Sequence, residues 1–162
     1  MTERGTVRAL AIAAAGLLVS ASVTSCSHGA SYCGTLKQDR KQLAALSAQT
    51  AGSSGKGSRA LTRTVALLSD LRDQSPSDIR DDWDTLVQAM QGLADAVKAS
   101  GADPAEFRGG RRPAGVTEGQ LRAVQQAAAE LQATPVEQAT KSIEQHALDV
   151  CKVDLSSQLG AG

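Results

Sequence analysis

Aromatic residues are almost absent from this sequence, whose 162 residues include one Trp, one Tyr and one Phe. β-Strands favour aromatic and β-branched side chains, whereas closely packed helices are rich in residues such as Ala, Leu and Gln. Those three residues are abundant here. The composition therefore predicts an all-α fold.

The chain also has no net charge. Seventeen Lys and Arg residues balance seventeen Asp and Glu residues. Proteins that bind nucleic acids usually carry a marked excess of basic residues. The balance gives no indication of a nucleic-acid partner, and we expect none.

The apolar run near the N-terminus is too short to cross a membrane. A transmembrane helix needs roughly 20 apolar residues, whereas the run at 9–19 has eleven. This run follows Arg4 and Arg8 and gives way to small polar residues, which is the pattern of an export signal. We therefore expect residues 1–25 to be a signal peptide that is removed.

The expected signal leads into Val23-Thr24-Ser25-Cys26, which resembles a bacterial lipobox: an aliphatic residue, two small residues and an obligatory Cys. In proteins with that motif the Cys sulfur receives a diacylglyceryl group, and signal peptidase II cleaves just before it. Cys26 is therefore the expected lipidation site, with membrane lipid as a partner. The alternative is an ordinary secreted protein, cleaved nearby, in which Cys26 is an unpaired thiol.

The other two cysteines, Cys33 and Cys151, lie near the two ends of the mature chain. Disulfides persist outside the cytosol, so we expect these residues to be bonded to each other. Closing so long a loop restricts the unfolded chain by an entropy equivalent to about 4 to 5 kcal/mol. The alternative, two thiols that bind a metal, lacks neighbouring ligands at local spacings.

Apolar residues recur at helical spacings in five segments of the mature chain. The clearest segment starts near residue 79, where the spacings alternate between four and three as in a heptad seam; its inward residues are Ile79, Trp83, Leu86, Met90, Leu93 and Val97. The other helices are expected at about 34–49, 59–74, 118–132 and 135–153. Their inward residues are Leu36, Leu43, Leu46, Leu61, Thr64, Val65, Leu68, Leu71, Leu121, Val124, Ala128, Leu131, Val136, Thr140, Ile143, Ala147 and Val150. Connections rich in Gly, Ser or Pro are expected at 51–58 and 102–116.

These segments predict a disulfide-closed up-down bundle of four long helices plus one short helix. If Cys33 meets Cys151, the chain makes an even number of full-length passes between them. Five helices are an odd number, so either the short helix at 118–132 lies across one end or the loop before it crosses back along the bundle. The expected organisation is a signal peptide at 1–25, a lipid-anchored tether at 26–33, the bundle at 34–155 and a polar tail at 156–162.

Three stretches, YCGTLKQDRKQLAAL, LRDQSPSDIRDDWDTLVQAM and IEQHALDVCK, resemble a group of small exported lipoproteins of actinobacteria. The resemblance covers nearly the whole mature chain. It implies a lipid anchor on the extracytoplasmic face of the cell membrane, a helical domain and the cysteines at 33 and 151. It implies nothing catalytic.

Groups suited to metal binding or catalysis are isolated in the sequence. His28 and His146 have no ligand motif around them. The acidic residues that open the third helix lack the alternating ligands and central Gly of an EF-hand loop and suit the positive end of the helix dipole; they are Asp78, Asp81, Asp82 and Asp84. No G-x-S-x-G, S-x-x-K or phosphate-binding glycine motif is present. We therefore expect no catalytic residue, metal or cofactor.

Three classes of function remain open. The first is a non-enzymatic module that is anchored to the membrane and binds an envelope protein or cell-wall component. The second is a carrier of a small ligand or metal, which requires a site inside the bundle. The third is an enzyme. Arg108, Arg111 and Arg112, beside Phe107, are either a contact for an anionic surface or an exposed connection.

Overall fold

The computed structural model describes residues 26–51, 56–108 and 111–156. Side chains are described in 31–49, 56–108 and 111–156. The expected signal peptide, the lipobox-like residues before Cys26 and the polar tail from residue 157 lie outside this part, as does the Cys26 side chain. The described residues form helices, turns and loops without a strand, which confirms the all-α prediction.

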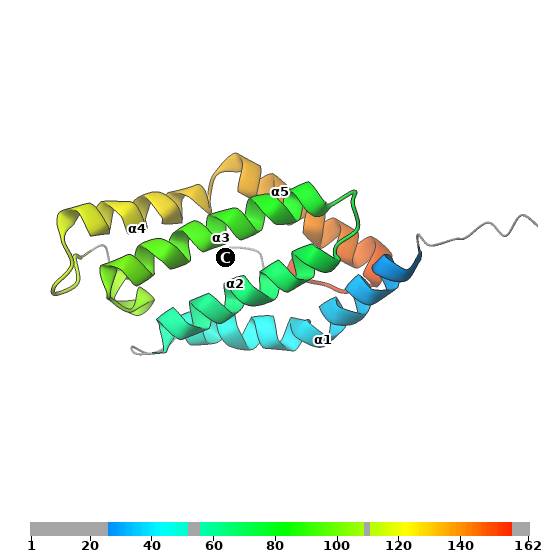
Figure 1. Ribbon diagram of the computed structural model, residues 1–162, viewed down its shortest axis with the longest axis horizontal. Coiled ribbons are helices and arrows are strands. Elements are labelled where there is room, and N and C mark those ends of the chain that lie inside the picture. Colours follow the sequence, from blue (N-terminus) through cyan, green and yellow to red (C-terminus); the bar gives the residue numbers. More distant parts are fainter. Residues whose placement is uncertain (1–25, 52–55, 109–110, 157–162) are drawn as a thin grey trace, which may run out of the picture.

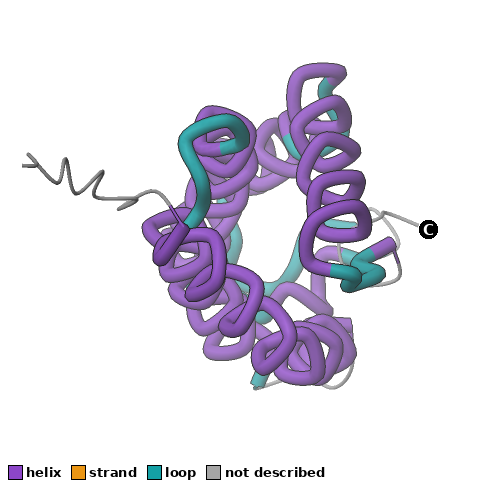
Figure 2. The backbone as a smooth tube through the Cα atoms, turned by 90° about the vertical axis from the view of Figure 1, so that its right-hand side faces the viewer, coloured by secondary structure: helices purple, strands orange, loops and turns teal. Residues whose placement is uncertain are grey.

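The described residues contain five α-helices: α1 (Cys26–Ala51), α2 (Gly57–Gln74), α3 (Arg80–Ser100), α4 (Glu118–Glu130) and α5 (Thr134–His146). A 3-10 turn, η1 (Pro104–Phe107), follows α3, and a π-helical turn, η2 (Ala147–Cys151), extends α5. Helices α1, α2 and α3 run in alternating directions, and α4 and α5 then return one after the other along α3 (Figure 1). Seen from the disulfide end, the helices surround a common axis (Figure 2).

Two helices, rather than one, follow α3 along the bundle. Helices α4 and α5 have 13 residues each, and both pack against α3. A new helix starts at Thr134 because Pro135 fits the first turn of a helix but not its interior. The predicted helices are all present: α5 continues directly into η2, so the last helical segment runs from Thr134 to Cys151, and α4 is the short helix. The segment predicted at 118–132 lies along the bundle and not across its end.

Helix α1 begins at Cys26, eight residues earlier than the predicted start at Gly34. Its inward residues are Tyr32, Leu36, Leu43 and Leu46, all buried and spaced as one helical face. The segment 26–33, expected to be a tether, is thus part of the helical domain.

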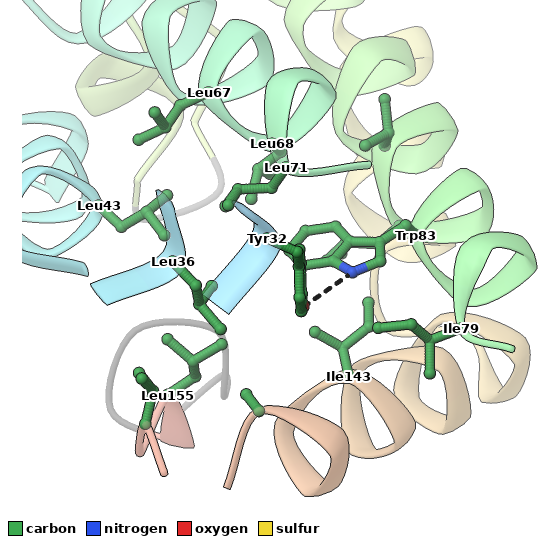
Figure 3. Packing of buried hydrophobic residues seen from close by; sticks show 14 of the residues in the cluster. Tyr32, Leu36, Leu43, Leu67, Leu68, Leu71, Ile79, Trp83, Ile143 and Leu155 are labelled. Atoms are coloured by element: carbon green, nitrogen blue, oxygen red, sulfur yellow. Dashed lines mark hydrogen bonds between the residues drawn. The ribbon is translucent and has the colours of Figure 1, made fainter. Parts of the chain in front are cut away.

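The main core extends from the disulfide end, where Tyr32 and Trp83 are fully buried (Figure 3), to Leu46 of α1 and Ala60 of α2. The segment after η2 completes this core. Lys152 adopts a left-handed conformation with φ of 57°, and the Val153 backbone N–H donates to the Ala147 carbonyl at 3.0 Å. The chain reverses there, and Val153 and Leu155 become buried.

The turn η2 changes which residues of the last helical segment face the core. The heptad pattern predicts Val150 inside, but Val150 is 59% exposed and Cys151 is buried. Hydrogen bonds in a π-helix span five residues instead of four, so each turn contains more residues. Cys151 therefore follows Ala147 on the core side and forms the predicted disulfide with Cys33, with an S–S distance of 1.97 Å and a Cα–Cα distance of 5.0 Å.

Candidate functional site

The residues singled out from the sequence lie mainly at one end of the bundle, the disulfide end. The disulfide joins the first turns of α1 to η2, and Cys26 is the first residue of α1. The His146 side chain, 11% exposed, places Nε2 3.8 Å from Asp78 Oδ2. The described residues include no group of three or more His, Cys, Asp or Glu that could hold a metal ion.

Tyr32 is packed as a structural residue at this end. The Trp83 indole N–H donates to its hydroxyl oxygen at 3.2 Å, and the two rings meet edge to face with centroids 6.3 Å apart. The His146 ring lies 5.9 Å from the Tyr32 ring. Burial raises the pKa of Tyr32 to about 12, so the phenol remains neutral at physiological pH and is unsuited to act as a base there.

A second apolar cluster lies at the opposite end of the bundle, where α4 begins (Figure 1). Its buried members are Leu61 of α2, Val97 of α3 and Val124 of α4. Beside it is an open groove of about 220 Å³, lined by Leu61, Leu93, Val97, Pro104, Phe107, Arg108, Val124 and Ala128. Apart from Arg108 every lining side chain is apolar, so the groove suits an apolar group.

Asp103 holds one wall of this groove in place. Its Oδ2 accepts a hydrogen bond from the Gly57 N–H at 3.0 Å, and its Oδ1 accepts one from the Ala105 N–H at 3.1 Å. A Cβ on Gly57 would lie 2.7 Å from Asp103 Oδ1, so this approach requires glycine. Glu106 completes a capping box by accepting from the Asp103 N–H at 2.8 Å. The turn η1 is thereby fixed against the start of α2, which positions Phe107 and Arg108.

The Pro- and Gly-rich composition of 102–116 predicts a connection without regular structure, whereas Pro104–Phe107 form η1. A signal for η1 is present nonetheless: Asp103, Pro104 and Glu106 match a capping box with Pro in the first turn. Five residues that line the groove are predicted to face inward, but only the structure shows that one groove brings them together: Leu61, Leu93, Val97, Val124 and Ala128.

A second groove, of about 330 Å³, adjoins the first and shares Leu61 and Val97 with it. Its other lining residues include Arg59 and Lys98. Cationic side chains therefore border the apolar groove: Arg108 lines it, and Arg59 and Lys98 line the adjoining groove.

Charged residues are unevenly distributed along the bundle, although the whole chain is neutral. The end with the grooves, called the basic end, carries the cations Lys56, Arg59, Arg63, Lys98, Arg108, Arg111, Arg112 and Arg122. Of the acidic residues there, Asp103 and Glu106 form the capping box, Glu118 Oε2 lies 3.6 Å from Arg122 Nη1, and Asp95 accepts a hydrogen bond from the Gln91 side chain at 2.9 Å. The disulfide end carries more acidic residues than basic ones, with Asp73, Asp78, Asp81, Asp82 and Asp149 set against Arg72, Arg80 and Lys152.

No known protein family, curated protein or solved structure matches this chain. Within the described residues, none of the helices combines the length and the apolar character that crossing a membrane requires.

Proposed function

We propose that this protein is a lipid-anchored, non-enzymatic binding module on the extracytoplasmic face of an actinobacterial cell membrane. The observation that carries the proposal is the separation of two features along the bundle. Cys26 starts α1 at one end, and the apolar groove with its cations lies at the other (Figure 1). Anchoring through Cys26 presents the basic end to an envelope protein or cell-wall component.

The cysteines support an extracytoplasmic location. Cys33 and Cys151 are positioned for a disulfide, and structural disulfides belong to oxidising compartments. That pairing leaves one cysteine, Cys26, which follows the lipobox-like residues Val23, Thr24 and Ser25. A diacylglyceryl group on its sulfur supplies two acyl chains, enough for stable membrane attachment.

The lining of the groove supports binding rather than catalysis. Its one polar side chain, Arg108, carries N–H donors and no acceptor atom, so it supplies no general base. A guanidinium group does attract carboxylates and phosphates. The groove is therefore suited to bind apolar and anionic groups.

The alternative function is a small-ligand carrier, and the volume of the groove favours it specifically. A buried apolar cavity of about 150 Å³ is enough to hold benzene, and the groove has about 220 Å³. The two functions differ in where the ligand stays: a carrier keeps its small molecule when the protein is extracted from the membrane, whereas an interaction module binds a component that remains in the envelope.

Two measurements on the full chain in actinobacterial cells test the proposal. Cell fractionation should place the protein with the membranes, and Cys26→Ser should release it or leave the signal uncleaved. A photo-crosslinking residue at Arg111 should capture an envelope component, and the same residue at Asp149 should capture phospholipid. Membrane association unaffected by Cys26→Ser would refute the anchor, and identical products from both positions would refute the orientation.

A further inference from the structure

The apolar groove and its flanking cations together have the features of a site for an amphiphile. Buried Leu61, Val97 and Val124 form its inner side, and Phe107 closes it from η1. Each methylene group that leaves water for such a surface contributes about 0.8 kcal/mol. A short stretch of acyl chain is therefore a suitable occupant.

The cations select the sign of the head group. Arg108 lines the groove, and Arg59 and Lys98 line the groove next to it. Arg111 and Arg112 are exposed on the connection that leads to α4. A carboxylate or phosphate placed at this end meets positive potential from several directions, whereas a cationic head group is repelled.

The shape of the apolar surface favours a slender chain over the flat face of a protein. Among the described residues, the exposed large hydrophobic side chains are Leu148 and Val150, both on η2 at the disulfide end. At the basic end the apolar surface is recessed within the groove. Stable protein interfaces usually bury about 800 Å² on each partner, far more than one groove of this volume provides.

We infer that the groove binds an anionic acyl lipid, with the end of one acyl chain against Leu61, Val97 and Val124 and the anionic head group beside Arg108. This inference names the ligand class of the site in the proposed function and rests on that proposal for its biological setting. The contacts themselves depend only on the basic end.

The test uses membranes isolated from cells that make the full chain, together with the soluble fraction of the same cells. A dodecanoate analogue with a diazirine near its methyl end is added to both and activated by light. Its uncharged methyl ester serves as the matched probe. Labelled sites are mapped by mass spectrometry, and labelling is expected in the tryptic peptides 99–108 and 123–141, which contain Phe107 and Val124.

Two substitutions on α4 distinguish labelling within the groove from nonspecific labelling of the protein. Ala128 lines the groove, so Ala128→Phe fills it and should reduce labelling about tenfold or more, since several methylene groups lose their contacts. Ala129 is exposed and does not line the groove, so Ala129→Phe should leave labelling unchanged. Helical circular dichroism of each purified variant checks that it is folded.

The head group is tested with Arg108→Gln, an exposed position whose replacement leaves the apolar lining intact. It should weaken labelling by the carboxylate probe roughly threefold to tenfold and leave labelling by the ester unchanged. Unlabelled dodecanoate should compete with the probe, and inorganic phosphate should not.

Several results would overturn the inference. They are equal labelling of Ala128→Phe and Ala129→Phe, equal labelling by acid and ester, competition by phosphate alone, or labelling confined to η2. Crosslinking of the groove to a second protein would replace the lipid by a protein partner. Membrane association is measured independently, by cell fractionation. A protein found in the soluble fraction but labelled in the groove would therefore refute the anchor and support the lipid site.

Discussion

The Trp83 indole N–H donates a hydrogen bond of 3.2 Å to the Tyr32 hydroxyl, which ties α3 to the first turns of α1. The two residues are 51 positions apart, and each is the sole residue of its type in the chain. The remaining aromatic residue, Phe107, lines the groove at the other end. Tyr32 and Trp83 therefore hold α1 against α3 beside the expected lipid anchor, and Phe107 forms part of the candidate binding site.

Replacing Tyr32 by Phe should destabilise the protein by about 1–3 kcal/mol, because the buried Trp83 N–H loses its partner. For a domain of this size the melting temperature should fall by about 2–8 °C for each kcal/mol. Thermal unfolding followed by circular dichroism measures the effect. The double variant Tyr32→Phe/Trp83→Phe removes both polar groups and should cost less than the sum of the two single variants. Additive losses would show that the hydrogen bond contributes nothing.

Tyr32 should make the protein less stable in alkaline solution. Its pKa is raised from 10.0 to about 12 by burial, so the folded state holds the phenolic proton more tightly than the unfolded state does. This contribution is fully present below pH 10.0 and is lost as the pH rises towards about 12. Since the chain has one Tyr, tyrosinate absorbance reports this group alone. A native titration midpoint at the ordinary value would contradict the burial, and Tyr32→Phe should remove the corresponding pH dependence.

Asp39 and Asp70 oppose each other across α1 and α2. Burial, followed by the negative charge of Asp70, raises the pKa of Asp39. The contribution of Asp39 to stability is therefore fully present below the pKa of the unfolded chain and is lost as the pH rises through the folded value. Asp39→Asn should raise the urea midpoint at neutral pH, with the gain disappearing at about pH 3.

Asp154 provides the matched control for that prediction. Hydrogen bonds from Ser156 lower the pKa of Asp154, so its contribution is present above the unfolded pKa and is lost as the pH falls through the folded one. Asp154→Asn should produce no gain at neutral pH. Equal responses of the two variants would show that Asp39 and Asp70 do not repel each other in the folded protein.

Removing the disulfide should lower stability strongly while leaving the helices formed. Cys33 and Cys151 are separated by 118 positions, and a loop of that length corresponds to about 4 to 5 kcal/mol of unfolded-state entropy. Cys33→Ser and Cys151→Ser should each lower the melting temperature by a similar amount and retain helical circular dichroism. Two free thiols in protein purified from the cell envelope would refute the bond.

The helices and most inward residues were predictable because their apolar residues recur at helical spacings over several turns. The early start of α1 was not, since Gly34 interrupts the pattern and glycine disfavours helix interiors. Tyr32 compensates by packing against Trp83, a contact between distant positions that local pattern does not reveal. The groove escaped prediction for the same reason: its lining comes from α2, α3, η1 and α4.

Val150 is the clearest departure from the heptad pattern. A continuous heptad places Val150 in the core, whereas η2 leaves it 59% exposed. Val150→Ser should therefore change the free energy of unfolding by less than about 0.5 kcal/mol, as for most surface positions. Ile143, fully buried seven residues earlier on the same segment, is the matched comparison, and Ile143→Ala should cost about 2–5 kcal/mol. Urea unfolding measures both. A loss for Val150→Ser as large as that for Ile143→Ala would mean that the helix continues in its α-helical register, and Cys151 would then lie off the core face that brings it to Cys33.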